Sequence, residues 1–222
     1  MEISLTEENY IKAIFSINHS NDGGGVSTNA LSGHLHNKAA SVTDMLKRLA
    51  AKKLIHYEKY KGVFLTAKGE KMALAVIRKH RLWEVFLTEK LRFKWDEVHD
   101  IAEQLEHVKS EELISRLDAF LGCPKFDPHG DPIPDARGLI NNTKAKPLNR
   151  FNQKGRFVFM GVLEHAPAFL QHLSAMGLKL GDTLQVEEVI PFDRSLKVRI
   201  NKHTVHFLSE KVSAGILVEV KK

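Results

Sequence analysis

The chain has 222 residues, of which 43% are hydrophobic and 27% charged, a composition typical of a globular protein with one large domain or two to three small ones. Its single cysteine, Cys123, excludes an internal disulfide and a zinc site built from several cysteines, and the net charge of +6 permits a polyanionic partner without requiring one. No apolar run is long enough to cross a bilayer and the start lacks the pattern of a signal peptide, so we expect a cytoplasmic protein without membrane association.

The first 72 residues have the order of elements found in a winged helix-turn-helix. Ser4 and Glu7 match a capping box, which predicts the start of a first helix. A second short helix follows a glycine-rich break, and a third carries apolar residues at helical spacing. Two β-prone runs, 54–57 and 63–65, then flank a basic hairpin tip. This order predicts a DNA-binding domain over residues 1–72.

Polar side chains of the third helix and the hairpin suit contact with DNA. The start of a recognition helix presents side chains to base edges, and basic residues further along can neutralise phosphates. For any single lysine, a purely solubilising role is the alternative. The predicted DNA-binding residues are Lys38, Ser41, Thr43, Asp44, Lys47, Arg48, Lys59 and Lys61.

The segment 73–140 predicts a helical domain. Thr66 can cap a long helix that reaches about Arg92, and further helices are expected from Trp95 to Val108 and from Ser110 to Leu121. The apolar stripe of the last helix suits either a core within one chain or a dimer seam.

Acidic and imidazole side chains cluster at helical spacing in this domain. His80 and Glu84 are four residues apart in the long helix. At about 100° per residue, four more such side chains fall within a wedge of roughly 100° on the next helix. A solvated helix face normally mixes Lys with Glu, whereas this face offers only groups that bind metals. The pattern predicts a divalent-metal site, and a polar face that happens to hold two histidines is the alternative. The four residues are His99, Glu103, Glu106 and His107.

The remainder of the chain changes character. Residues 122–150 are rich in Pro, Gly, Asn and Asp, which predicts an irregular segment that ends in a linker at 141–150. Short β-prone runs separated by turn residues then follow, with one helical piece at 168–176 among them. This spacing predicts a small five-stranded barrel over residues 151–222, so the fold class is expected to be mainly α with β. The β-prone runs are 157–159, 183–186, 196–200, 205–207 and 216–220.

Three motifs resemble the diphtheria toxin repressor and manganese transport regulator family. They are Arg78–Glu84, the run Val98–His107, and Asp131-Pro132-Ile133-Pro134. The segment 169–182 is similar to the SH3-like, or FeoA-like, domain that longer members append. The resemblance spans the whole chain. It implies a metal-dependent transcriptional repressor of metal-uptake genes that binds a palindromic operator in double-stranded DNA as a homodimer, with two Mn²⁺ or Fe²⁺ ions per subunit and no small-molecule substrate.

The resemblance also implies two metal sites and their ligands. One site would use three helical side chains and a ligand from the barrel, and the other would use three helical side chains and a ligand from the first helix. Asp127 matches a position that supplies a further ligand in some manganese-type relatives, and an ordinary surface role is the alternative for it and for the barrel candidates. The first set is His80, Glu84 and His99 with Glu164 or His165 near the barrel position, and the second is Glu103, Glu106 and His107 with Asn9.

One position departs from the pattern of the family. Iron-type members resemble one another in having Met at the position of Asn9 and Cys at that of Glu103, whereas manganese-type members have Asp and Glu. An Asn oxygen still suits a hard cation. Oxygen and imidazole ligands without a sulfur ligand favour Mn²⁺, with Fe²⁺ next.

Two other classes of protein use similar residues. Helical metalloenzymes with a carboxylate-bridged metal pair carry Glu-x-x-His motifs on two helices, whereas Glu103 stands four residues before His107. The other class is a DNA-binding protein with a purely structural metal site. A metal-dependent shift of operator DNA without turnover of a substrate would separate these classes.

Overall fold

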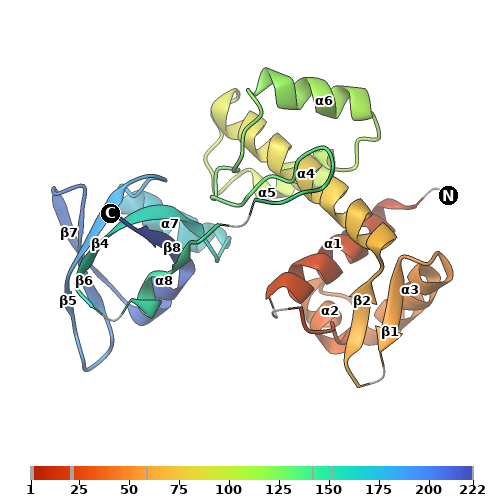
Figure 1. The fold of residues 1–222 in the computed structure, drawn as a ribbon, viewed down its shortest axis with the longest axis horizontal. Coiled ribbons are helices and arrows are strands. Elements are labelled where there is room, and N and C mark those ends of the chain that lie inside the picture. Colours follow the sequence, from red (N-terminus) through yellow and green to blue (C-terminus); the bar gives the residue numbers. More distant parts are fainter. Residues whose placement is uncertain (1–2, 21–22, 59, 142, 152, 222) are drawn as a thin grey trace. The chain divides into compact units, whose positions relative to one another are not determined.

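The computed structural model describes residues 3–20, 23–58, 60–141, 143–151 and 153–221. The chain forms two compact units. The first comprises Met1–His80, Gln104–Ser110 and Pro134–Leu139, and the second comprises Arg81–Glu103, Glu111–Ile133 and Ile140–Lys222. Figure 1 colours the chain from the N-terminal helices in red to the C-terminal sheet in blue.

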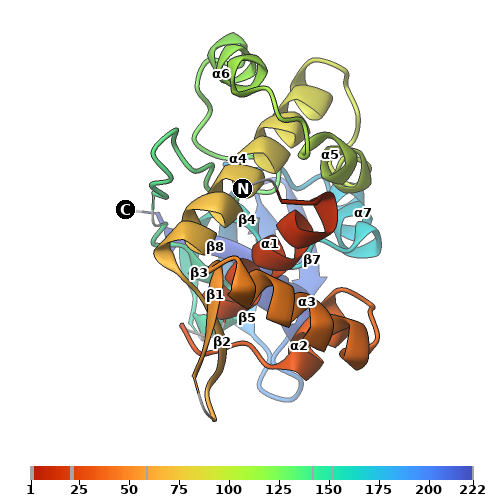
Figure 2. The same ribbon diagram turned by 90° about the vertical axis from the view of Figure 1, so that its right-hand side faces the viewer.

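The predicted winged helix-turn-helix is present in the first unit (Figure 2). The capping box forms as expected, because the Ser4 backbone N–H donates to the Glu7 carboxylate at 2.7 Å and the Glu7 N–H donates to Ser4 Oγ at 3.3 Å. Ser27 caps the second helix by accepting from the Ala30 N–H. The elements are α1 (Leu5–Ser20), α2 (Thr28–His34), α3 (Ala39–Ala51) and an antiparallel wing of β1 (Ile55–Glu58) and β2 (Gly62–Leu65).

The helix α4 (Ala67–Glu89) follows the wing directly. Thr66 caps it as predicted, since Thr66 Oγ1 accepts from the Gly69 N–H at 3.1 Å. The helix α6 (Glu111–Phe120) confirms the third helix predicted in this region. The side chains of Ile114 and Leu117 are buried against Leu82 and Val85 of α4, so this part of the apolar stripe belongs to a core within the chain.

The helix predicted from Trp95 to Val108 is wrong in its bounds. Residues before 99 form turns, in which the Lys94 N–H donates to the Glu97 carboxylate, and α5 comprises only His99–Leu105. The chain then tightens, because the Val108 N–H donates to the Leu105 carbonyl three residues back. Glu106 and His107 therefore lie beyond the helix, and the four predicted metal-binding side chains do not share one helical face.

All five predicted β-runs appear as strands in the second unit. They lie in an antiparallel sheet with the order β3-β8-β4-β5-β6-β7, and a fifteen-residue buried cluster around Phe159 forms its core. The short β3 (Lys146–Pro147) and a 3₁₀ helix (Leu148–Arg150) fall in the stretch for which an irregular linker was predicted. The other elements are β4 (Gly155–Val162), α7 (Pro167–Ala175), β5 (Thr183–Val189), β6 (Leu196–Ile200), β7 (Thr204–Leu208), α8 (Glu210–Gly215) and β8 (Ile216–Val220).

Within the described residues, no helix combines the length and the apolar character that a membrane span requires.

Candidate metal centre and DNA-binding surface

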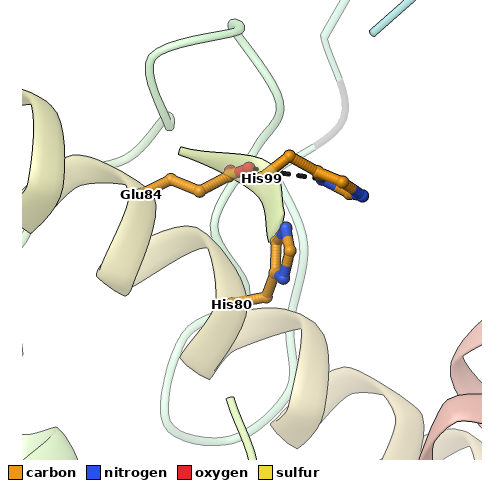
Figure 3. Close-up of side chains that lie close together, drawn as sticks. All are labelled: His80, Glu84 and His99. Carbon is orange, nitrogen blue, oxygen red and sulfur yellow. Dashed lines mark ion pairs between the residues drawn. The ribbon is translucent and has the colours of Figure 1, made fainter. Parts of the chain in front are cut away.

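The first predicted set of metal ligands lies together. His80 and Glu84 are one turn apart on the continuous helix α4, and His99 begins α5 (Figure 3). Each offers one ligand atom, and these atoms lie within 4.8 Å of one another. Glu84 is buried and its Oε1 is 3.7 Å from Nδ1 of the exposed His99 ring. A buried carboxylate facing two imidazoles is a ligand set for a divalent cation of intermediate hardness.

Glu103 does not join the second predicted set in the described residues. Its Oε1 is 3.8 Å from His99 Nε2, one turn back on α5, and its side chain is half exposed. It therefore lies beside the first cluster.

Glu106 is completely buried and makes two charged contacts. Its Oε2 is 2.5 Å from His80 Nδ1, and Lys12 of α1 donates to its two oxygens at 2.9 and 2.6 Å. Burial alone would raise the pKa of Glu106, but the contacts with His80 and Lys12 hold it below its ordinary value. The carboxylate is thus ionised and already associated with two cationic or polarisable partners.

Asn9 carries the strongest sign that α1 supplies a ligand. Its Oδ1 is buried and has no hydrogen-bond partner among the described residues. A buried amide oxygen without a partner is costly, and a bound cation would satisfy it. Near it in sequence, Glu8 Oε2 lies 2.5 Å from His107 Nδ1, so Glu8 is a candidate that the sequence did not reveal. The donor set Asn9, Glu106 and His107 therefore fits a hard divalent cation.

The candidate ligands near the barrel have different positions. Glu164 is exposed, and its carboxylate accepts from the Ala166 N–H two residues on, so it is used in a local turn. His165 packs edge-on against His129, with ring centres 5.1 Å apart. Asp127 is buried in a second cluster with Glu84 and His129. His129 was not predicted, because only the fold of its loop brings it to Glu84.

The predicted DNA-binding residues that the structure describes are all exposed. Lys38 is the N-cap of α3, and Ser41, Thr43 and Asp44 occupy the first two turns of this helix. Lys47 is held only by an exposed pair with Asp44, at 3.2 Å, which is a weak interaction. Lys61 follows the tip of the wing, and Lys59 lies outside the described residues. Arg48 is exposed in the third turn of α3.

A winged helix followed by helices with clustered imidazole and carboxylate side chains defines the class of metal-responsive DNA-binding proteins. Family models agree with this class. Residues 2–63 match the iron dependent repressor N-terminal DNA binding domain, and residues 66–135 match the iron dependent repressor metal binding and dimerisation domain. Residues 146–220 match the FeoA domain.

Solved structures cover the whole chain. A manganese-dependent transcriptional repressor in complex with manganese is 32% identical with a TM-score of 0.88, covering 97% of this chain and 100% of that one. The manganese regulator SloR is 30% identical with a TM-score of 0.78, covering 97% and 98%. The chain belongs to the iron-dependent repressor family, which includes the diphtheria toxin repressor.

Curated relatives match over a shorter stretch. The iron-dependent repressor IdeR of Mycobacterium leprae is 33% identical over 144 residues, which are 65% of this chain and 62% of that protein. The diphtheria toxin repressor of Corynebacterium jeikeium is 32% identical over 149 residues, 67% of this chain and 61% of that protein. The chain thus spans a little under two thirds of the length of these two relatives.

Proposed function

We propose that this protein is a transcriptional repressor, activated by Mn²⁺ or Fe²⁺, that binds a palindromic operator as a homodimer in the cytoplasm and controls metal-uptake genes. The convergence of His80, Glu84 and His99 in a chain that starts with a winged helix carries this proposal. The relatives described above are named as iron- or manganese-dependent repressors or regulators, which supports it.

Two ions per subunit are proposed, each with its own ligands. His80, Glu84 and His99 would hold one ion. Asn9 from α1, with Glu106 and His107, would hold the other, and Glu103 would supply a further carboxylate to either. A bound cation would neutralise the carboxylates and polarise nothing further, so its contribution is structural.

The effect on DNA binding would pass through α1. This helix already reaches the segment after α5 through Glu8 and Lys12. A ligand from Asn9 would add a stronger bond between the same two segments. Since α1 packs in the core of the winged helix through Ile11 and Ile14, its position would bias that of α3. Metal affinity and operator affinity would then be reciprocally coupled.

Manganese is the favoured ion, with iron next, because the proposed ligands are oxygen and imidazole atoms without sulfur. Zn²⁺, Co²⁺ and Ni²⁺ would also bind the isolated protein, because affinity rises along the Irving–Williams order. Activation by those ions in vitro would therefore not identify the physiological metal.

Anaerobic titration of a fluorescent operator with Mn²⁺ and with Fe²⁺ tests the proposal. We expect operator binding only when metal is present, and loss of the metal dependence in His99→Ala, whose exposed side chain can be removed without opening the core. Arg137→Ala, an exposed position that contacts only Asp135 in the described residues, is the control for fold and solubility. Operator binding that is unaffected by chelation would contradict the proposal.

A further inference from the structure

The loop Asp127–Asp131 brings two side chains to the side of Glu84 that His99 does not occupy. Asp127 Oδ1 accepts from the N–H groups of His129 and Asp131, at 2.8 and 2.9 Å. The loop is docked on β4, where the Val162 N–H donates to the His129 carbonyl at 3.0 Å. Gly130 permits this approach, because it has φ +88° and a Cβ there would lie 2.1 Å from the Met160 carbonyl oxygen. The backbone therefore fixes both side chains.

The hydrogen bonding of His129 determines which ring nitrogen faces Glu84. Its Nε2 lies 2.8 Å from the Trp95 carbonyl oxygen, so Nε2 carries the hydrogen and donates it. The other nitrogen, Nδ1, is 3.6 Å from Glu84 Oε2. In the neutral ring this nitrogen directs a lone pair at a carboxylate, an arrangement that requires a proton or a metal ion between them. Histidines that bind metals usually donate their second N–H to a carbonyl in this way.

The charges around this loop leave a deficit of positive charge. Three carboxylates, those of Glu84, Asp127 and Asp131, face one permanent cation, the Arg81 guanidinium. Arg81 Nη2 is 3.3 Å from Asp131 Oδ2 and its Nε is 3.6 Å from Asp127 Oδ2. With neutral histidines two negative charges remain uncompensated, and Glu84 and Asp127 are almost fully buried. One divalent cation, or two protons, would neutralise them.

The pKa values of the loop are consistent with this deficit. Burial, with the negative charges of Asp131 and Glu84, raises the pKa of Asp127 to about 8. Burial alone would lower the pKa of His129, but Glu84 and Asp127 raise it to about 9. Both groups retain protons that an ion at this position would replace.

We propose that Glu84, Asp127 and His129 form an additional buried site for a divalent cation such as Mn²⁺, distinct from the site of His80, Glu84 and His99 but sharing Glu84 with it. The three side chains are all buried, and one ligand atom of each lies within 4.8 Å of the others. His165, whose buried Nε2 has no hydrogen-bond partner in the described residues and lies 3.4 Å from Asp131 Oδ2, would line the approach to this site. The inference rests on the proposed function only through the shared Glu84.

The number of bound ions tests the inference. Equilibrium dialysis against Mn²⁺, with metal counted by mass spectrometry, should give one ion fewer per chain for Asp127→Asn and for His129→Gln than for the wild type. His99→Gln is the matched control, since it removes a ligand of the other site on Glu84. We expect it to lose a different ion, so that His99→Gln combined with Asp127→Asn loses two. Unchanged stoichiometry and affinity in both Asp127→Asn and His129→Gln would overturn the proposal.

A direct measurement on the wild type avoids the risk that a buried substitution disturbs folding. Anomalous diffraction from crystals soaked in Mn²⁺ should show a peak bound by Glu84, Asp127 and His129. A peak beside His80 and His99 alone would overturn this inference and leave the proposed function intact. A peak at Asp127 and His129 alone would support the inference and contradict the ligand set of the proposed function.

Discussion

Lys12 places an ammonium group against both oxygens of Glu106, the positions from which this carboxylate would coordinate an ion. Glu106 has almost no exposed surface and the Lys12 side chain is 17% exposed, so solvent screens the pair poorly. A cation that enters this site must therefore compete with a positive charge that belongs to the chain itself.

Replacing this lysine should strengthen metal binding. In Lys12→Gln the ammonium is removed while a hydrogen-bond donor to Glu106 remains, so we expect Mn²⁺ affinity at this site to rise on the order of tenfold, about 1.4 kcal/mol. Lys52→Gln is the control, because Lys52 pairs with Glu7, another glutamate of α1, away from the proposed ligands. Isothermal titration of both variants measures the effect. Weaker Mn²⁺ binding in Lys12→Gln would show that Lys12 supports the site instead of competing for it.

The raised pKa values of Asp127 and His129 predict a stability that falls with pH. Each group binds its proton more tightly in the folded chain than at its ordinary pKa, 3.8 for Asp127 and 6.5 for His129. The stability that these protons provide is complete below the ordinary pKa and is lost as pH rises towards the folded values of about 8 and about 9.

In the presence of a chelator, the melting temperature should therefore fall between pH 6.5 and 9, with each kcal/mol lost corresponding to about 2–4 °C for a chain of this size. Calorimetry across this range measures the effect. Asp127→Asn should show a shallower decline, because one of the two titrating groups is gone. A constant melting temperature would be incompatible with protons held by these groups.

The candidate site shows which ligands a sequence can reveal. His80 and Glu84 were predictable because four residues span one helical turn whatever the tertiary structure. Glu8 and His129 were missed because the contacts of Glu8 with His107 and of His129 with Glu84 join distant parts of the chain. The orphaned oxygen of Asn9 was equally invisible, since its identity as a candidate came from the family resemblance and its burial came from the fold.

At the scale of single elements, α3 and the wing present basic side chains that make no strong internal contact. Removing Lys47 should weaken binding to all DNA sequences, because a phosphate contact carries no sequence information. We expect Lys47→Gln to reduce the slope of log affinity against log salt concentration by about 0.9. Lys211→Gln, an exposed position on α8, should leave the slope unchanged. Equal slopes for the two variants would remove Lys47 from the interface.

Ser41 and Thr43 should act differently from the lysines. Both are exposed near the start of α3, and Thr43 Oγ1 donates to the Ala39 carbonyl, which leaves its oxygen lone pairs and methyl group available. Substitution of either residue by Ala should relax discrimination between operators, by about 1–3 kcal/mol for each base-specific interaction that the substitution removes, with little change in the salt slope. Competition binding against operators with single base changes provides the measurement. Uniformly reduced affinity would assign these residues to phosphate binding instead.

The length of an element was harder to predict than its presence. Apolar and polar periodicity continues through residues 95–108, but α5 occupies only His99–Leu105. Before it, Trp95 is drawn into the core of the C-terminal sheet and its indole N–H donates to Ser174. After it, Glu106 turns to meet Lys12 and His80. These contacts outweigh local helix propensity, which is worth only a few tenths of a kcal/mol per residue.

At the scale of the whole molecule, homodimerisation is expected to use the outer face of α6. Phe120 and Leu113 are 65% and 42% exposed on this helix, while Ile114 and Leu117 face the core. We expect Phe120→Asp to shift the protein towards monomer and to weaken operator binding, because a charge would have to be desolvated at the seam. Sedimentation measures the oligomeric state, with Phe192→Asp in the exposed β5–β6 connection as the control. An unchanged dimer in Phe120→Asp would place the interface elsewhere.

The two oxygens of Glu84 face different histidines, with Oε1 near His99 and Oε2 near His129. If both proposed ions bind, the second arrives at a carboxylate whose charge the first has already neutralised, and the two cations repel across it. Occupancy of this pair should then rise over more than the usual span of free metal concentration, with a Hill coefficient below one. A cell that relied on such a sensor would adjust transcription gradually as its metal supply changed, instead of switching it at a single threshold.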